Sequence, residues 1–381
     1  MEKRKDKGYN SPHSEGLGEA LTAQEKNRYS RHLLLDKVGE RGQEKLKAAK
    51  VLVIGAGGLG CPVLQYLTAA GVGTIGIIDF DVVDETNLQR QVLFSISDVG
   101  ENKALAAKNR LEQLNQYVDF NIYQEKLTTQ NAIELFEQYD IIVDGTDNFS
   151  TRYLVNDACV KTGKPLVYGA IYKFEGQVSV FNYKNGPSYR CLFPEAPEAG
   201  SVPNCSEIGV IGVLPGLIGT QQANETIKLI LEIGTPLSGK LVLYDALQAS
   251  QMVLNIERNE EQIILANQID FDTYDYDYFC GLKQKKMENE INAKELQELI
   301  ANESIQIIDV REEWEQPKVE ALNAINIPLQ TIPENLNKID KDKKVVIFCQ
   351  HGVRSLHAID YLKQQGYNNL INLTGGIVTF E

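Results

Sequence analysis

The sequence predicts an α/β protein, in which a domain built on a mostly parallel sheet is followed by a smaller α/β domain. Short apolar runs at residues 51–54, 75–79 and 141–144 each end at or just before a glycine or an aspartate, and amphipathic segments such as 103–115 lie between them. This alternation predicts parallel strands joined by right-handed helical crossovers. A chain of 381 residues is also too long for one ordinary domain.

Composition divides the chain into four segments. Residues 1–24 are charged and polar and are predicted to form a flexible tail, and residues 25–280 the first domain. Residues 281–287 are predicted to be a polar linker, and residues 288–381 the second domain. The elements predicted in the second domain are a helix at 295–300 and strands at 305–310 and 345–348.

The pattern of predicted strands and helices in the first domain changes after residue 165. Strands of alternating character are predicted at 177–181 and 240–244, with a helix at 214–233 between them. Residues 185–213 form a long segment that contains proline and glycine. A loop of that length inside a compact domain is usually functional.

Composition and charge exclude several classes of function. The formal net charge of −14 argues against a general affinity for nucleic acid or for anionic membranes. The N-terminal residues lack the apolar stretch of a signal peptide, and no apolar run approaches the roughly 18 residues that span a membrane. The six cysteines are irregularly spaced and are predicted to be reduced thiols. We therefore expect a cytoplasmic protein.

A glycine-rich turn follows the first predicted strand. Residues 51–54 run directly into residues 55–60 (GAGGLG, the glycine loop), a helix begins there, and Asp79 ends the next strand. In this Rossmann-like arrangement the glycines let the backbone approach a phosphate group, and the helix N-terminus favours its negative charge. The carboxylate can accept bonds from ribose hydroxyls. On this motif alone, an NAD-dependent oxidoreductase is the leading interpretation.

Further charged residues favour a different reaction. Residues 87–91 (NLQRQ) follow the second strand, Lys103 begins a predicted helix, and residues 144–148 (DGTDN) end another strand. Adenylation breaks the bond between the α- and β-phosphates of ATP, so it needs cations on the developing charge and a carboxylate for Mg²⁺. Arg90, Lys103 and Asp147 supply that set, and they lie near strand ends, where open α/β sheets bind ligands.

These residues also carry a family resemblance. From about residue 24 to residue 257 the chain resembles the MoeB/ThiF/HesA group, relatives of ubiquitin-activating enzymes. The resemblance implies an enzyme that uses ATP to adenylate the C-terminal glycine of a small ubiquitin-like sulfur-carrier protein. The matching stretches are RYSR at 28–31, the glycine loop, DFDVVDETNLQRQ at 79–91, VGENKA at 99–104 and GTDNFSTRYLVND at 145–157.

The resemblance implies roles for individual residues. Gly58 lies against the nucleotide, Asp79 holds its ribose and Asp147 positions Mg²⁺. Arg31 reaches into the nucleotide site of a partner subunit, so a homodimer is implied. The residues implied to contact the phosphates are Asn87, Arg90 and Lys103. The complete set of predicted nucleotide-binding residues is Arg31, Gly55, Gly57, Gly58, Gly60, Asp79, Asp81, Asn87, Arg90, Gln91, Lys103, Asp147 and Asn148.

The cysteines of the first domain have different predicted roles. Cys61 and Cys159 lie in apolar helical patterns and are predicted to be buried, inert thiols. Cys205 lies in the long loop, and the resemblance aligns it with a cysteine that can hold the carrier as a thioester or pair with it through a persulfide.

The resemblance also concerns a metal site. Many relatives have a CxxC pair near residue 190 and a second pair downstream, which together bind a structural zinc ion. In this chain Ser188 replaces the partner of Cys191, and the region before the linker contains only Cys280. We therefore predict that no structural zinc is bound and that packing holds this corner. The aromatic residues predicted to do so, with the alternation of a strand, are Tyr274, Tyr276, Tyr278 and Phe279.

The second domain contains a cysteine between a strand and a helix. The strand 345–348 ends at Cys349, and an amphipathic helix follows residues 349–355 (CQHGVRS, the cysteine loop). Backbone N–H groups that converge there stabilise a thiolate or persulfide anion, and Arg354 adds positive charge. Cysteine-dependent phosphatases place one more residue between the cysteine and the arginine, so this shorter loop suits a sulfur atom better than a phosphate.

Residues 288–381 resemble rhodaneses. The resemblance implies that Cys349 takes sulfur from a persulfide donor and passes it to the activated carrier, which ends as a thiocarboxylate. The matching stretches are IDVREEW at 308–314, AINIP at 324–328, the cysteine loop and GGI at 375–377. The predicted catalytic residues of the two domains are Arg90, Lys103, Asp147, Cys205, Cys349 and Arg354.

Several alternatives stay open. A MoaD-like carrier of molybdopterin synthesis is favoured, a ThiS-like carrier of thiamine synthesis is the alternative, and a carrier that feeds tRNA thiolation also fits. An NAD-dependent oxidoreductase is one rival function. A non-catalytic module that only docks a ubiquitin-like protein is another. No nucleic acid or membrane is expected as a partner.

Overall fold

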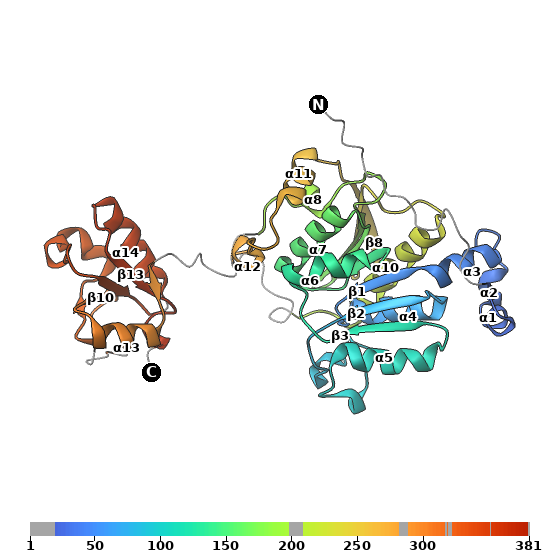
Figure 1. Ribbon diagram of the computed structural model, residues 1–381, viewed down its shortest axis with the longest axis horizontal. Helices are drawn as coiled ribbons and strands as arrows, with labels where there is room; N and C mark the ends of the chain where they lie inside the picture. The colour runs from blue at the N-terminus through green and yellow to red at the C-terminus, as the bar shows by residue number, and fades with distance from the viewer. Residues whose placement is uncertain are drawn as a thin grey trace. The chain divides into compact units, whose positions relative to one another are not determined.

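The computed structural model describes residues 20–197, 209–281, 289–316, 318, 322–350 and 352–379. The chain divides into two compact units, residues 1–283 and residues 284–381. The first unit is built on an eight-stranded sheet and the second on a five-stranded sheet (Figure 1). Most strand pairs of the first sheet and all pairs of the second are parallel, so the predicted α/β fold class is confirmed.

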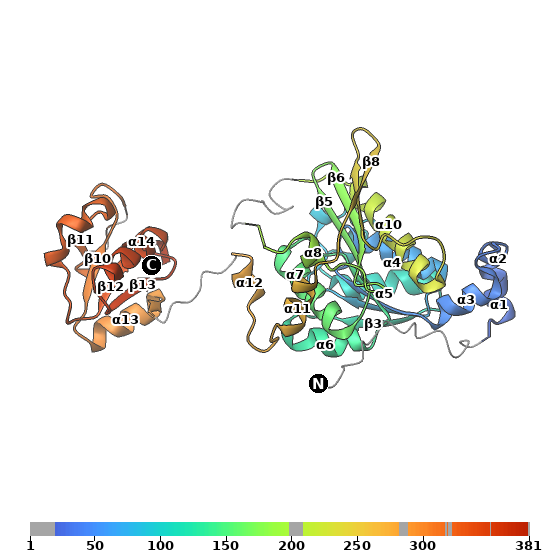
Figure 2. The same cartoon turned by 90° about the horizontal axis from the view of Figure 1, so that it is seen from above.

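The sheet of the first unit has the strand order β3-β2-β1-β4-β5-β6-β7-β8. Its parallel strands are β1 (Lys50–Ile54), β2 (Thr74–Ile78), β3 (Asp119–Tyr123), β4 (Ile141–Asp144) and β5 (Leu166–Tyr172). The antiparallel strands are β6 (Glu175–Phe181), β7 (Lys240–Asp245) and β8 (Ser250–Asn255). Figure 2 shows β6 and β8 extending beyond the body of this unit.

Helices cover both faces of this sheet. On one face α3 (Gly39–Ala48), α4 (Gly60–Ala70), α5 (Lys103–Leu114) and α10 (Val213–Leu231) share a core with Val51 and Val53 of β1. On the other face α6 (Thr129–Glu137) and α7 (Phe149–Thr162) share a core with Leu52 and Ile54. Because successive strand residues point to opposite faces, a strand covered on both faces is apolar without interruption. The other elements are α1 (Ala23–Arg28), α2 (Ser30–Leu33), η1 (Glu85–Asn87), η2 (Ile96–Asp98), α8 (Tyr189–Leu192), α11 (Glu260–Gln268) and α12 (Tyr276–Phe279).

The second unit has the strand order β11-β10-β12-β13-β9. Val345 and Ile347 of β12 pack in the core that α14 covers, and Val346 and Phe348 pack in the core that α13 covers. Asp309 at the end of β10 lies opposite Phe348, so the segments that follow these two strands start side by side. The elements are β9 (Glu290–Ile291), α13 (Ala293–Asn302), β10 (Gln306–Asp309), β11 (Ile325–Asn326), η4 (Leu329–Glu334), η5 (Leu336–Lys338), β12 (Val345–Phe348), α14 (Val353–Gln364), β13 (Leu370–Leu373) and η6 (Ile377–Thr379).

The N-terminal boundary differs from the prediction. Helix α1 begins at Ala23, the hydroxyl of Thr22 caps it, and Leu21 is buried. The predicted tail of residues 1–24 therefore ends too late, because the capping pattern of Thr22 and Glu25 already belongs to the fold. Residues 1–19 lie outside the described part of the chain, as does the predicted linker from residue 282 onward.

The aromatic run before the linker alternates like a strand in the sequence, but it contains the short helix α12. The side chain of Asp275 accepts hydrogen bonds from the backbone N–H groups of Asp277 and Tyr278 and caps the short helix α12. These local hydrogen bonds to Asp275 favour the helical conformation, which the alternation of aromatic residues does not indicate.

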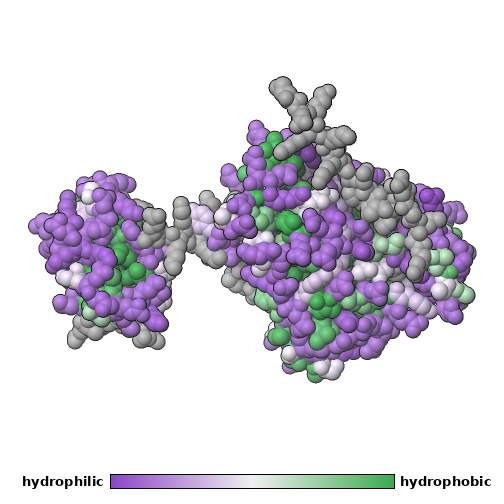
Figure 3. Space-filling view, in the orientation of Figure 1, coloured by the Kyte–Doolittle hydropathy of each residue, from purple (hydrophilic) through white to green (hydrophobic). Residues whose placement is uncertain are grey.

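The faces of the two units drawn in Figure 3 are mainly hydrophilic, with small hydrophobic patches. Within the described residues, no helix combines the length and the hydropathy that a membrane crossing needs.

Candidate active site

The glycine loop joins β1 to α4 through positions that require glycine. Gly55 has a φ of +89°. A side chain at Gly60 would place its Cβ 1.9 Å from the carbonyl oxygen of Gly55, so only glycine fits there. A Cβ at Gly55 would in turn lie 3.1 Å from the carbonyl oxygen of Gly145. The loop that follows β4 therefore lies against the glycine loop, at the N-terminus of α4.

Asp79, directly after β2, is fixed to the glycine loop. Its Oδ2 accepts the N–H of Ala56 at 2.8 Å, and its Oδ1 accepts the N–H of Asp81 at 2.9 Å. Burial raises the pKa of this carboxyl group, and the two backbone N–H groups oppose that rise. Each oxygen keeps a further lone pair, which suits the carboxylate to accept a bond from a ribose hydroxyl.

Lys103 and Asp81 form an ion pair beside Asp79. Lys103 is the first residue of α5 and is 7% exposed, and its Nζ donates to Oδ2 of Asp81 at 3.1 Å. Asn102 caps α5 and donates from Nδ2 to the carbonyl oxygens of Asp79 and Asp81 at 3.0 and 3.1 Å. The structure thus brings three of the predicted nucleotide-binding residues together, with a buried cation among them.

The segment that follows η1, whose last residue is Asn87, lies against the glycine loop. Cγ of Arg90 lies 3.7 Å from the position of a Cβ on Gly58, and Nε2 of Gln91 lies 3.8 Å from the position of a Cβ on Gly57. Gln91 is buried, and its Oε1 has no hydrogen-bond partner among the described residues. A buried acceptor of this kind suits a donor group on a ligand.

The end of β4 supplies a buried and an exposed carboxylate. Oδ1 of Asp144 accepts the N–H and the hydroxyl of Thr146 at 2.9 and 2.7 Å, and burial raises the pKa of Asp144. Asp147 is exposed. Oδ1 of Asn148 accepts the N–H of Thr151 at 2.9 Å and caps α7. Asn148 therefore has a structural use that the sequence analysis did not predict, and Asp147 is the side chain of this loop that is open to a ligand.

Arg31 is not brought together with Asp147. It is exposed on α2, and α2 lies at the far end of the unit from α7 in both Figure 1 and Figure 2.

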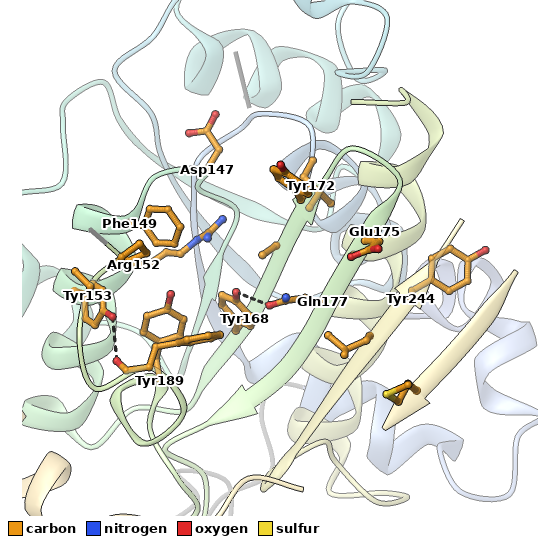
Figure 4. Close-up of a pocket in the computed structure, with 18 of the residues that line it drawn as sticks. Asp147, Phe149, Arg152, Tyr153, Tyr168, Tyr172, Glu175, Gln177, Tyr189 and Tyr244 are labelled. Atoms are coloured by element: carbon orange, nitrogen blue, oxygen red, sulfur yellow. Dashed lines mark hydrogen bonds between the residues drawn. The ribbon is translucent and has the colours of Figure 1, made fainter. Parts of the chain in front are cut away.

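A pocket of about 800 Å³ opens beside Asp147 (Figure 4). Its lining comes from α7, α8 and the strands β5 to β8, and most of its larger side chains are aromatic. The hydroxyl of Tyr153 donates to the carbonyl oxygens of Phe193 and Glu195 at 3.0 and 2.8 Å, which fixes one wall. A pocket that combines aromatic walls with several polar groups is typical of a binding site.

Arg152 lies between this pocket and the end of β4. Its guanidinium group is stacked near the rings of Phe149 and Tyr168, at 5.4 and 5.8 Å from the ring centroids. Nη2 donates to the carbonyl oxygen of Thr146 at 3.3 Å, and Nε has no hydrogen-bond partner among the described residues. Figure 4 shows the group directed into the space between Asp147 and Tyr168. Arg152 was not among the site residues predicted from the sequence, although an arginine inside a buried helix is a signal that its charge has a local partner or ligand.

In the second unit, the cysteine loop surrounds a buried sulfur atom. Cys349 is 1% exposed, and its Sγ accepts the N–H of Gly352 at 3.1 Å and the hydroxyl of Ser355 at 3.6 Å. Gly352 has a φ of +89°, and a Cβ on Gly376 would lie 2.5 Å from the carbonyl group of Gln350. The glycines of the GGI stretch therefore allow the C-terminal segment to close on the loop.

Arg354 is paired with a residue that the sequence analysis did not select. Its Nη1 and Nη2 donate to Oε1 and Oε2 of Glu315 at 2.6 and 2.7 Å. The guanidinium group lowers the pKa of Glu315 to about 2, so the pair is ionised at neutral pH. Arg354 still interacts electrostatically with Cys349, as predicted, and Glu315 offsets part of the positive charge that Arg354 brings to the loop.

Comparison with known proteins finds a family match for each of the two units. Residues 29–264 match the ThiF family, and residues 292–381 match the rhodanese-like domain. A chain from Mycobacterium tuberculosis named probable adenylyltransferase/sulfurtransferase MoeZ is 44% identical over 374 residues, which cover 95% of this chain and 94% of that one.

This chain belongs to the ThiF family.

Two further similarities concern the ThiF-family unit. A protein from Thermus thermophilus named sulfur carrier protein adenylyltransferase is 52% identical over 268 residues, which cover 69% of this chain and 99% of that one. The crystal structure of E. coli MccB with ATP has a TM-score of 0.54 and 26% identity, and the match covers 62% of this chain and 73% of that one. The prediction of an ATP-using adenylyltransferase joined to a rhodanese-like sulfurtransferase domain is confirmed.

The other cysteines of this ThiF-family chain differ from Cys349 in their surroundings. Burial raises the pKa of Cys61 and of Cys280 to about 12 and raises that of Cys159 well above its usual value. These thiols stay protonated at neutral pH, which makes them poor nucleophiles. Cys205 lies outside the described residues.

Packing and a buried ion pair fill the corner where relatives are implied to bind zinc. Arg190 and Asp157 are both fully buried, with Nε to Oδ1 and Nη2 to Oδ2 distances of 2.7 Å. The hydroxyl of Tyr276 donates to Oδ2 of Asp157 at 2.8 Å. The guanidinium group of Arg190 lies 4.8 Å from the ring centroids of both Tyr153 and Phe279. This cluster joins α7, α8 and α12.

The absence of structural zinc stays a prediction. The Sγ atom of Cys191 accepts the N–H groups of Ser188 and Asn259 at 3.3 Å each, and the described residues contain no group of three or more possible metal-ligating side chains. Metal analysis of protein purified without chelator should give far less than one zinc ion per chain, and EDTA should leave the melting temperature unchanged. A tightly held, stoichiometric zinc ion would contradict this prediction.

Proposed function

We propose that this chain adenylates the C-terminal glycine of a ubiquitin-like sulfur-carrier protein, and that Cys349 then supplies the sulfur of a thiocarboxylate. One observation supports the first step above all others. The aromatic pocket opens at Asp147, on the loop that packs against the glycine loop. A carrier tail that lies in the pocket would therefore bring its terminal carboxylate to the nucleotide phosphates.

In the proposed reaction the carrier carboxylate attacks the α-phosphate of ATP, and pyrophosphate leaves. Lys103 and Arg90 would offset the charge that develops on the phosphates. Lys103 is suited to this role because it is buried and already forms an ion pair with a carboxylate. A phosphate oxygen could replace that carboxylate as the partner of Lys103. Asp147 is exposed at the pocket, which fits a Mg²⁺ ion held by one carboxylate together with phosphate oxygens and water. Such an ion would neutralise part of the phosphate charge.

Arg152 has a role of its own in this proposal. The attacking carboxylate and the α-phosphate are both anions, so they repel each other as they approach. The guanidinium group of Arg152, stacked on Phe149 and Tyr168 at the end of the pocket, would hold the carboxylate and offset that repulsion. Asp79 would hold the ribose at the other end of the nucleotide.

In the second step a persulfide on Cys349 attacks the carbonyl carbon of the acyl-adenylate, and AMP leaves. The N–H of Gly352 and the hydroxyl of Ser355 would stabilise the sulfur anion before the attack. The acyl group is then joined to Cys349 through a disulfide, and a thiol must cleave that bond to release the thiocarboxylate. Cys205 remains our candidate either for this step or for a thioester with the carrier.

The assembly and the pathway belong to the same proposal. We infer a homodimer in which Arg31 reaches the nucleotide of the partner subunit, which is consistent with the distance between α2 and α7 within one chain. A MoaD-like carrier of molybdopterin synthesis stays the favoured substrate and a ThiS-like carrier the alternative, in the cytoplasm.

Exchange of labelled pyrophosphate into ATP tests this function. We expect exchange only when Mg²⁺ and a MoaD-like or ThiS-like carrier ending in Gly-Gly are present, and none with the same carrier lacking its last glycine. The carrier that supports exchange identifies the pathway. A protein whose melting temperature rises with NAD but not with ATP, and that shows no exchange, would support the oxidoreductase instead.

A further inference from the structure

The segment that follows β10 holds the cysteine loop at two points. Arg311 is 1% exposed; it pairs with Asp309, and its Nη1 donates to Oε1 of Gln350, the second residue of the loop, at 2.9 Å. Four residues later, Glu315 pairs with Arg354, the sixth residue of the loop. The IDVREEW stretch and the glutamate that follows it therefore act directly on the loop that carries the sulfur.

Glu315 occupies the edge of Arg354 with which an arginine binds an oxyanion. The two terminal nitrogens of Arg354 each donate to a different oxygen of Glu315. This two-pronged geometry is the one that a guanidinium group offers to carboxylate, phosphate or sulfonate groups. Glu315 is also held in place, because its Oε1 accepts the N–H of Glu312 at 2.9 Å and its side chain is only 13% exposed.

The charges around the Glu315–Arg354 pair also disfavour the binding of an anion. Glu312 and Glu313 are exposed next to Glu315, and Asp309 offsets the charge of Arg311. The guanidinium group of Arg354 interacts electrostatically with the thiol of Cys349, so a donor that reaches the sulfur meets this arginine. An incoming dianion would find its natural binding group already neutralised, with further negative charge nearby.

We propose that Glu315 is a specificity-determining residue that disfavours dianionic sulfur donors such as thiosulfate relative to persulfides. The inference rests on the proposed sulfur transfer. With thiosulfate, the Cys349 thiolate attacks the outer sulfur, the S–S bond breaks, sulfite leaves with the bonding electron pair, and a Cys349 persulfide remains. The sulfonate group of thiosulfate needs a cation, whereas a persulfide donor leaves as a thiolate and has no sulfonate to bind.

Steady-state kinetics of the full-length chain test this role, with thiosulfate and glutathione persulfide as the two donors. In Glu315→Gln the freed guanidinium group should lower the KM for thiosulfate at least about fivefold, with kcat changed less than about twofold. The KM for glutathione persulfide should change less than about twofold. Glu298→Gln, which removes an exposed charge from α13 of the same unit, is the matched control and should leave both KM values near those of the wild type.

The lower KM for thiosulfate in Glu315→Gln must depend on Arg354. Adding Arg354→Met to Glu315→Gln should abolish the lower KM for thiosulfate, and high salt should reduce it. Should Glu315→Gln fail to fold, as judged by its melting curve, Glu315→Ala removes the same charge and carries the same expectation. An unchanged or raised KM for thiosulfate in a folded variant, or a gain that survives Arg354→Met, would overturn the role of Glu315. A wild-type chain that forms no Cys349 persulfide with either donor would instead overturn the proposed sulfur transfer.

Discussion

Replacing Lys103 by alanine is expected to slow carrier-dependent pyrophosphate exchange by at least ~10²-fold, because a cation that stabilises developing phosphate charge contributes about 3 kcal/mol or more to a transition state. Lys103 is nearly buried, and its partner Asp81 has a half-exposed side chain, so the variant leaves no unpaired buried carboxylate. The fold should therefore survive the change. The effect should appear mainly in the exchange rate and not in the melting temperature.

The same helix offers a control for this experiment. Lys108 pairs with Glu112 on the surface of α5, and Lys108→Ala removes a cation without touching the glycine loop. We expect Lys108→Ala to exchange pyrophosphate like the wild type. Exchange by Lys103→Ala at the wild-type rate would show that Lys103 does not contact the reacting phosphates.

Replacing Cys349 by serine should abolish sulfur transfer to the carrier and leave pyrophosphate exchange unchanged. Adenylation needs no thiol, whereas the proposed transfer needs a persulfide on the sulfur that Gly352 and Ser355 surround. The serine oxygen can accept the same two hydrogen bonds, so the loop should keep its conformation. Mass spectrometry of the carrier measures the transfer, and the exchange assay measures the adenylation.

Cys191→Ser serves as the control for the cysteine experiment. Cys191 is a partly exposed thiol of the first unit, and no proposed step of the reaction involves it. We expect the variant to keep both activities. If Cys349→Ser loses both activities together, Cys349 is needed for the structure, and its proposed role as the sulfur carrier is wrong.

The parallel core of the fold could be predicted because its strands are buried on both faces. In β1 and β12 nearly every residue is apolar, so each strand stands out as an uninterrupted run. The edge strand β8 could not be predicted in the same way, because all six of its residues are exposed. Its position depends on pairing with β7, which is a property of the tertiary fold.

The residues of the candidate site show the same difference between what the local sequence indicates and what the tertiary fold decides. The glycine loop, Asp79 and Lys103 could be selected because each lies at a strand or helix end that the local pattern marks. Arg152 and Glu315 were missed because their positions depend on distant partners. Glu315 pairs with a residue 39 positions away, and Arg152 of α7 lies over the ring of Tyr168 on β5. The capping role of Asn148 depends only on the local sequence. Its charged neighbours nevertheless led to the prediction that Asn148 binds the nucleotide.

Mass spectrometry of the carrier after incubation with the full-length protein tests the central claim most directly. With ATP, Mg²⁺ and a persulfide donor, we predict that the C-terminal glycine exchanges one carboxylate oxygen for sulfur, and that omission of ATP prevents the change. A carrier that stays a carboxylate under all conditions, or that gains sulfur equally well without ATP, would contradict the coupling of adenylation to sulfur transfer in this chain.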